Sequence, residues 1–254
     1  MTRVCRIWAC AGFTFDDAIL SCGGLIWEQS AAGMPVEIWT LCAGDPPAAS
    51  LSRFAKRTHA DWNTGTALET VALRRVEDRN AARQVGAVAH HFPIPDCIYR
   101  RHPVSGRALY TRTVFRAPAR VEAPLAGHMA ALIRSRLTEE DTLVCPLGLG
   151  RHIDHTLTRR AAEMLGRPLL YYADIPYLFK HPEQLPRLSR GLVTMDYSVS
   201  RDGLRAWQKG IAAYASQIGG LFPDVEAMRA AIKEYWAARR GIALWQPAAG
   251  GGLI

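Results

Sequence analysis

The sequence has no long hydrophobic run, no closely spaced cysteine pair and no internal repeat. No apolar segment approaches the ~20 residues that a helix needs to span a bilayer, so we expect no membrane partner. The six cysteines are scattered through mostly apolar segments, which favours buried thiols in a reducing cytoplasm over a disulfide framework or a zinc knuckle. The N-terminal residues MTRVCRIWACAGF lead directly into a motif, so we predict a strand there and not a signal peptide.

Acidic residues are outnumbered, since 31 lysines and arginines face 23 aspartates and glutamates for a net charge of +8. The basic residues are spread along the chain and are not interleaved with aromatics, which argues against a nucleic-acid partner. A plain solvated surface or attraction for an anionic small molecule explains the charge better. With 254 residues, 49% hydrophobic, the chain fits one globular domain over residues 1–254.

Strand and helix patterns alternate along the chain. Residues 4–11 predict a buried strand, residues 17–32 a helix, and residues 35–42 a second strand. Such a βαβ unit implies a parallel sheet with a right-handed crossover. The remaining predictions are a long loop (43–66), strands (87–92, 142–145, 169–172, 191–197), helices (67–85, 118–136, 156–165, 203–218, 224–238) and a floppy tail (248–254).

Two polar clusters follow strands of this sheet. Asp16 and Asp17 come after the first strand, and His152-Ile-Asp-His155 comes after residues 142–145. Open α/β sheets bind ligands at the carboxyl ends of their strands, and imidazole and carboxylate groups are ligands of Zn²⁺. Each cluster alone is weak evidence for a site, because an Asp-Asp pair is often a helix N-cap and the residues of an H-x-D-H pattern often face solvent. Together they indicate a metal-assisted hydrolase.

These motifs resemble the PIG-L/LmbE family of metal-dependent N-deacetylases. The family's A-H-P-D-D motif, followed by a glycine pair, is matched by FTFDDAILSCGG (13–24), and its H-x-D-H motif by residues 152–155. Residues 74–86 resemble its R-x-x-E…A-A-x-x-L-G helix. The resemblance covers most of the chain and implies a Rossmann-like three-layer α/β/α fold with a mostly parallel sheet. It also implies removal of an acyl group, typically acetyl, from an amide nitrogen of a sugar-like or other small-molecule conjugate.

The resemblance assigns roles to individual residues. It makes Asp17 and His155 metal ligands, Asp16 the general base, and His152 the residue that stabilises the tetrahedral intermediate. Asp154, inside the second motif, joins the candidate catalytic set. The expected metal is Zn²⁺ or another divalent ion such as Fe²⁺. The sequence departs from the family at Thr14, because the family has a metal-binding histidine there and a hydroxyl is a far poorer zinc ligand.

The substitution at Thr14 leaves three alternatives. The metal binds through Asp17, His155 and a substitute ligand or an extra water, which leaves a functional hydrolase with altered metal affinity. The metal is lost, and a pseudoenzyme or binding protein remains. Or the pocket performs metal-free acid–base work on another substrate. The retained H-x-D-H motif beside both aspartates favours the working hydrolase, because folding alone does not require that set.

The expected substrate contacts come from three parts of the chain. His59 and Trp62 lie in the long loop, Arg100 lies in the turn-rich segment 96–101, and Tyr214 lies on a C-terminal helix with Lys209 and Gln217. Arginines in the first two segments favour an anionic group on the substrate. They are Arg53, Arg57, Arg100 and Arg101. Solvent exposure explains them equally well, and the sequence leaves a homo-oligomer open.

Overall fold

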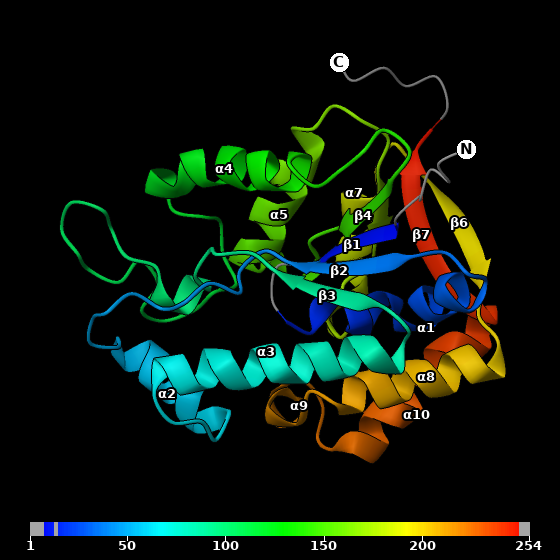
Figure 1. The fold of residues 1–254 in the computed structure, drawn as a ribbon, viewed down its shortest axis with the longest axis horizontal. Coiled ribbons are helices and arrows are strands. Elements are labelled where there is room, and N and C mark those ends of the chain that lie inside the picture. Colours follow the sequence, from blue (N-terminus) through cyan, green and yellow to red (C-terminus); the bar gives the residue numbers. More distant parts are fainter. Residues whose placement is uncertain (1–7, 13–14, 249–254) are drawn as a thin grey trace.

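Strand β1 (Trp8–Gly12) lies inside the sheet and pairs in parallel with β2 (Val36–Thr40) on one side and β4 (Thr142–Pro146) on the other (Figure 1). The computed structural model describes residues 8–12 and 15–248 of the chain. In the register of β1 with β4, Cys10 lies opposite Val144. The chain leaving β1 therefore emerges beside the chain leaving β4, although about 130 residues separate them in sequence.

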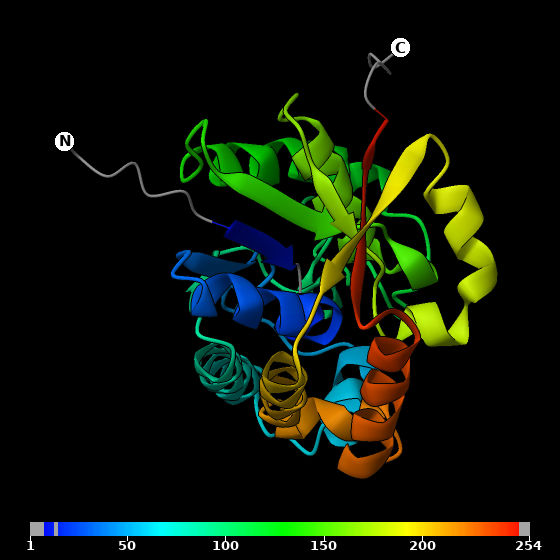
Figure 2. The same ribbon diagram turned by 90° about the vertical axis from the view of Figure 1, so that its right-hand side faces the viewer.

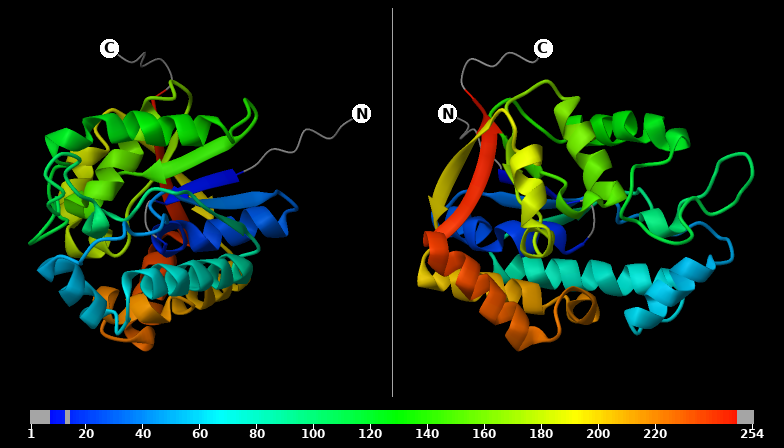
Figure 3. Two further views of the ribbon diagram at one scale, coloured as in Figure 1. Left: turned by 60° about the vertical axis from the view of Figure 1, so that its left-hand side comes forward. Right: turned by 180° about the vertical axis from the view of Figure 1, so that it is seen from behind.

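The other strands extend the sheet in both directions. They are β3 (Val88–His91), β5 (Leu170–Tyr172), β6 (Leu192–Ser198) and β7 (Gly241–Pro247). The order in the described part of the chain is β3-β2-β1-β4-β5-β7-β6. The pairings from β3 to β5 are parallel, whereas β7 runs antiparallel to both β5 and β6. Figure 3 shows β6 and β7 at one edge of the sheet.

Helices cover both faces of the sheet. The main ones are α1 (Asp17–Ala31), α2 (Arg53–Asp61), α3 (Ala67–Gln84), α4 (Ala123–Arg134), α5 (Ile153–Glu163), α8 (Arg201–Ala212), α9 (Ala215–Leu221) and α10 (Val225–Arg239). Short helices are α6 (Tyr177–Lys180) and α7 (Leu185–Leu188), with 3-10 turns η1 (Cys97–Tyr99), η2 (Arg120–Glu122), η3 (Leu149–Arg151) and η4 (Pro182–Gln184). Figures 1 and 2 show α4 and α5 on one face, and α1, α3, α8 and α10 on the other. The predicted three-layer α/β/α fold is thus confirmed.

The glycine pair after the aspartates allows α8 to pack closely on α1. A Cβ at Gly23 would lie 2.5 Å from the indole of Trp207, and a Cβ at Gly24 would lie 2.8 Å from Val199. The buried Trp207 indole also donates hydrogen bonds to the carbonyls of Ile19 (2.7 Å) and Leu20 (3.1 Å). These contacts hold the helix that carries Asp17 against the C-terminal half of the chain.

Several predicted boundaries were wrong. The long loop over residues 43–66 contains α2, which begins after Ser52 because that hydroxyl accepts a hydrogen bond from the Ala55 amide. The helix predicted over residues 203–218 is two helices, α8 and α9, separated at Tyr214. Strand β7 was missed: it follows α10 directly and inserts between β5 and β6. Residues 4–7 of the first predicted strand, and the end of the tail, lie outside the described residues.

Over residues 8–12 and 15–248, none of the helices combines the length with the apolar composition that crossing a membrane requires.

Candidate active site

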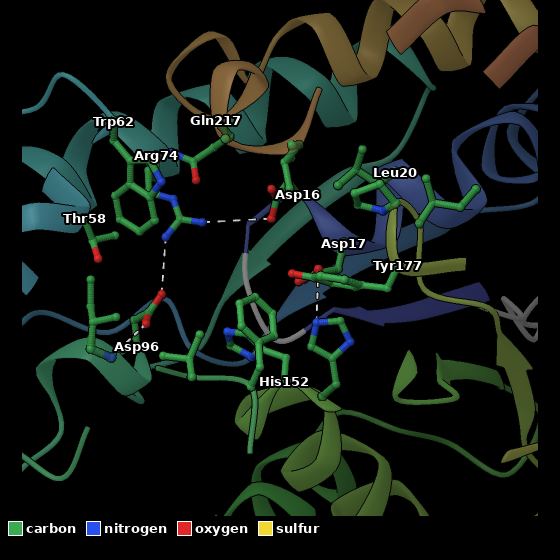
Figure 4. A pocket seen from close by; sticks show the side chains of 18 of the residues that line it. Asp16, Asp17, Leu20, Thr58, Trp62, Arg74, Asp96, His152, Tyr177 and Gln217 are labelled. Atoms are coloured by element: carbon green, nitrogen blue, oxygen red, sulfur yellow. Dashed lines mark hydrogen bonds and ion pairs between the residues drawn. The ribbon is translucent and has the colours of Figure 1, made fainter. Parts of the chain in front are cut away.

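A pocket of about 180 Å³ lies where the chain leaves β1 and β4 (Figure 4). Parallel strands bring their carboxyl ends to one edge, and the strand order reverses its direction between β1 and β4, which is the usual ligand crevice of open α/β sheets. Its walls come from both sequence motifs, from α2, α3 and α9, and from the segments that follow β3 and β5. The lining residues are Asp16, Asp17, Leu20, Phe54, Thr58, Trp62, Arg74, Asp96, Ile98, Val114, Phe115, His152, His155, Ile175, Pro176, Tyr177, Gln217, Gly220 and Leu221.

The two aspartates occupy the first positions of α1. Asp16 is the N-cap residue and Asp17 begins the helix, where the positive end of the helix dipole favours carboxylates. Both are buried, at 5% and 6% exposure. The Asp16 carboxylate lies 3.9 Å from the guanidinium of Arg74 on α3, as Figure 4 shows. Asp16 and Asp17 therefore present two carboxylates to one pocket from a fixed helix start.

His155 faces Asp17 across the pocket. Its Nε2 atom lies 3.7 Å from Oδ1 of Asp17, and its ring is 1% exposed. Its Nδ1 atom bonds Asp174, an equally buried residue just after β5. Burial alone would lower the pKa of His155, but Asp174 and Asp17 raise it above its usual value. A cation at this point would thus compete with a proton for Nε2.

His152 lies beside His155, with ring centroids 5.1 Å apart. It is the N-cap of α5, and its Nδ1 atom accepts a hydrogen bond from the Asp154 amide at 3.2 Å. Burial and the neighbouring His155 lower the pKa of His152 to about 3, so the ring is neutral at pH 7. Because Nδ1 accepts, the proton of the neutral ring lies on Nε2. His152 is thus arranged as a hydrogen-bond donor.

Asp154 lies behind His152 and does not line the pocket. One of its oxygens accepts from the Arg100 guanidinium, and the other from the Cys97 amide at 3.1 Å. Burial raises the pKa of Asp154, but Arg100 and His152 more than offset this and leave it below its usual value. Both oxygens of the carboxylate thus accept hydrogen bonds from within the protein. Its contacts suit it to fixing the start of α5 and the electrostatics around His152, not to contacting substrate.

Donor atoms of Cys97, His152 and Asp154 lie within 4.8 Å of one another, a spacing compatible with a metal ion. The chemistry fits poorly, however. Burial and the nearby Asp154 raise the pKa of the Cys97 thiol well above its usual value, and only a thiolate is a good ligand. Asp154 already forms an ion pair with the guanidinium of Arg100. We therefore favour Asp17 and His155 as the metal-binding pair.

That pair fits a divalent ion. Zinc bonds to histidine nitrogen and carboxylate oxygen at about 2.0–2.2 Å, so two donors 3.7 Å apart can share one ion. A histidine whose other nitrogen bonds a carboxylate is the usual form of a zinc ligand. The third expected ligand position, Thr14, lies outside the described residues.

One pocket wall combines an aromatic surface with charge. The Arg74 guanidinium lies over the rings of Phe15 and Trp62, 4.9 and 4.5 Å from their centroids. It also pairs with Asp96 at 3.3 Å. Among the predicted substrate contacts, Trp62 lines the pocket, and so does Gln217 on α9. Figure 4 shows Trp62, Arg74 and Asp96 together on this wall.

The other predicted substrate contacts lie elsewhere. His59 is bonded through Nε2 to the Tyr99 hydroxyl (2.8 Å) and through Nδ1 to the Gly65 carbonyl. Arg100 bridges Asp154 and Glu122. The Tyr214 hydroxyl donates to Asp78 at 2.6 Å. All three are buried by partners within the protein and do not line the pocket.

Several residues in or beside the pocket are not singled out by the sequence motifs. The sequence indicates Arg74 only as part of a helix motif and Asp96 only as the start of the turn-rich segment 96–101. Asp174 and Tyr177 follow β5, and the position of β5 next to β4 was the one signal that could have indicated them. Tyr177 packs on His155, with ring centroids 5.4 Å apart. Gly150 permits this packing, because a Cβ there would lie 2.6 Å from the Tyr177 ring.

Comparison with known proteins agrees with the sequence resemblance. Residues 15–165 match the family described as GlcNAc-PI de-N-acetylase (PIG-L). The chain is 28% identical over 227 residues to a 2'-N-acetylparomamine deacetylase of Niallia circulans, covering 83% of this chain and 80% of the relative. It is also 28% identical to a 2'-N-acetylparomamine deacetylase of Streptomyces fradiae, covering 89% and 76%. Its fold is similar to the zinc-inhibited form of teicoplanin deacetylase, with a TM-score of 0.82, 24% identity, and coverage of 97% and 100%.

Proposed function

The chain belongs to the GlcNAc-PI de-N-acetylase (PIG-L) family, and we propose that it is a metal-dependent hydrolase that removes an acetyl group from the amide nitrogen of a sugar-like small molecule. One observation carries the proposal: the Asp17–His155 pair, with its donor atoms 3.7 Å apart, lies in the same pocket as Asp16 and His152.

Asp17 and His155 would hold the ion, which is Zn²⁺ or another divalent metal such as Fe²⁺. When bound, such an ion polarises the amide carbonyl and makes a water molecule more acidic. The donor set is one imidazole and one carboxylate, both of which zinc accepts. Thr14 takes the place of an expected imidazole, which predicts weaker binding than a complete ligand set would give.

Asp16 would act as the general base. Its carboxylate takes a proton from water as the water oxygen bonds to the amide carbon. The carbonyl oxygen then carries negative charge, and the Nε2–H of His152 is the donor that this chain offers to it. Breaking the carbon–nitrogen bond requires a proton on the leaving nitrogen, and Asp16 returns the one it took. The second proton of the water stays on the acid, so the products are the amine and acetic acid, which loses that proton to become acetate.

The charges that line the pocket give no net attraction for an anionic substrate, because a bound divalent ion and Arg74 together only balance the carboxylates there. The lining of the pocket includes the carboxylates of Asp16, Asp17 and Asp96 and a single guanidinium, that of Arg74. The exposed arginines behind the anionic prediction, Arg53 and Arg57, do not line it. The Trp62 ring beside the Arg74–Asp96 pair combines an apolar face with hydrogen-bonding groups, which suits a sugar ring. The named activity of the curated relatives, deacetylation of N-acetylparomamine, supports an amino-sugar substrate.

Elemental analysis tests the metal requirement. Protein equilibrated with Zn²⁺ or Fe²⁺ and then freed of excess ion should retain stoichiometric metal. Absence of metal, with no acetate released from N-acetylated amino sugars, would instead support the alternative of a metal-free pseudoenzyme or a repurposed acid–base protein using the same pocket.

Thr14→His should restore the missing ligand. We expect Zn²⁺ to bind at least about tenfold more tightly, equivalent to ~1.4 kcal/mol, because imidazole is a much better zinc ligand than a hydroxyl. Competition with a chromophoric chelator measures the affinity. Thr58→His, the same substitution on the pocket wall formed by α2, is the matched control and should leave the affinity unchanged. Equal affinities of Thr14→His and the wild type would mean that position 14 does not face the ion.

A further inference from the structure

A single carboxylate beside the pocket, that of Asp174, connects the segment after β5, the loop after β4 and His155. It follows β5 and is 1% exposed. Oδ2 accepts hydrogen bonds from two consecutive amides of the loop after β4, those of Gly148 (2.8 Å) and Leu149 (2.9 Å). Oδ1 bonds Nδ1 of His155. Asp174 therefore ties the loop that precedes the H-x-D-H motif to the last histidine of that motif.

These contacts define the direction of each hydrogen bond. The two backbone amides can only donate, so Oδ2 is an acceptor. Because a carboxyl group is ordinarily a stronger acid than an imidazolium, the proton between Oδ1 and the ring lies on Nδ1 of His155. In the neutral form of His155 the ring proton must then lie on Nδ1. The lone pair is left on Nε2, the atom that faces Asp17 at 3.7 Å. A metal binds that lone pair and not an N–H.

We propose that Asp174 is a positioning residue, which selects the Nδ1–H tautomer of His155 and holds the ring so that Nε2 can bind a divalent cation. The proposal rests on the proposed metal site of Asp17 and His155. It adds that a residue outside the ligand set, in the segment after β5, determines which ring nitrogen of His155 is available to a metal. Partners of this kind in metal sites typically change metal affinity by about 10–100-fold.

Asparagine at position 174 provides a sharp test because it has the same shape but only one accepting end. Turning its NH2 group toward Gly148 and Leu149 would set donors against two amide donors. The amide oxygen should therefore remain there, and the NH2 group should face His155. Nδ1 would then become the acceptor, and Nε2 would carry the proton toward Asp17. The tautomer that binds metal would be disfavoured without any change of side-chain size.

Asp78→Asn is a matched control. Asp78 is fully buried and also bonds a histidine, because Oδ2 contacts Nε2 of His91 at 2.8 Å and accepts from the Thr40 hydroxyl. It does not line the pocket. Both substitutions should lower the melting temperature, because each disturbs a buried hydrogen-bond network. A change in metal affinity is expected from the substitution at Asp174 alone.

The measurement is Zn²⁺ affinity by chelator competition on the folded proteins. We expect Asp174→Asn to bind Zn²⁺ about 10–100-fold more weakly than the wild type, and Asp78→Asn to bind as the wild type does. Equal affinities of the wild type and Asp174→Asn would overturn the positioning role while leaving the proposed metal site intact. Failure of the wild type itself to bind metal would overturn the proposed function instead.

A second measurement does not depend on the variant folding. Nitrogen-15 NMR of the metal-free wild type, at a pH well above the titration of His155, reports which ring nitrogen carries the proton. We expect the Nδ1–H form for His155. Observation of the Nε2–H form would contradict the proposal.

Discussion

Asp16→Asn should lower kcat for acetate release by about 10²–10⁴-fold, the usual contribution of a general base. The amide has nearly the shape of the carboxylate but cannot take a proton from water. Asp17 and His155 are untouched, so metal content should match the wild type. Substrate binding should change little, because the walls formed by Trp62 and Asp96 remain. Initial rates over a range of substrate concentrations, together with elemental analysis, measure these quantities.

Asp141→Asn is the control for this prediction. Asp141 is buried to a similar degree, at 4% exposure, but it accepts a hydrogen bond from the Thr138 amide at the turn before β4 and does not line the pocket. The same chemical change there should leave kcat intact. A wild-type rate for Asp16→Asn would assign the general base to another group.

His155→Gln should abolish both metal retention and activity. The change removes one of the two donors in the described part of the chain that converge at 3.7 Å, and an amide oxygen is a poor substitute for imidazole toward zinc. It also leaves the buried Asp174 carboxylate without its histidine partner, which should reduce stability. We expect metal content near background and a rate at least about 10³-fold below the wild type. Elemental analysis and acetate release measure the two effects.

His59→Gln separates loss of a ligand from loss of a buried histidine. His59 is 3% exposed and has hydrogen bonds through both ring nitrogens, but it does not line the pocket. Its replacement should cost stability while metal content stays normal. Retained metal and activity in His155→Gln would contradict the assignment of His155 as a ligand.

The convergence of the two motifs could be predicted from the sequence because it follows from strand order. A strand, a helix and a parallel strand imply a sheet whose carboxyl ends share an edge, and both clusters follow strands. Asp16, Asp17, His152 and His155 accordingly line one pocket. The position of Thr14 stays a prediction, because residues 13 and 14 lie outside the described part of the chain.

The contribution of Asp174 could not be predicted in the same way. Asp174 belongs to no motif. Its proposed role depends on β5 lying beside β4 and on the hydrogen bond that it accepts from the loop between β4 and the H-x-D-H motif. His59 and Tyr214 illustrate the opposite difficulty. A polar residue in a loop or on a helix can face a pocket or a buried partner, and their partners, Tyr99 and Asp78, are distant in sequence. Only the packed structure distinguishes these cases.

The metal dependence of acetate release tests the central claim most directly. The wild-type protein should release acetate from an N-acetylated amino sugar, lose that activity after treatment with a chelator, and recover it when Zn²⁺ or Fe²⁺ is added back. Acetate release that persists unchanged after the chelator has removed all bound metal would contradict the account.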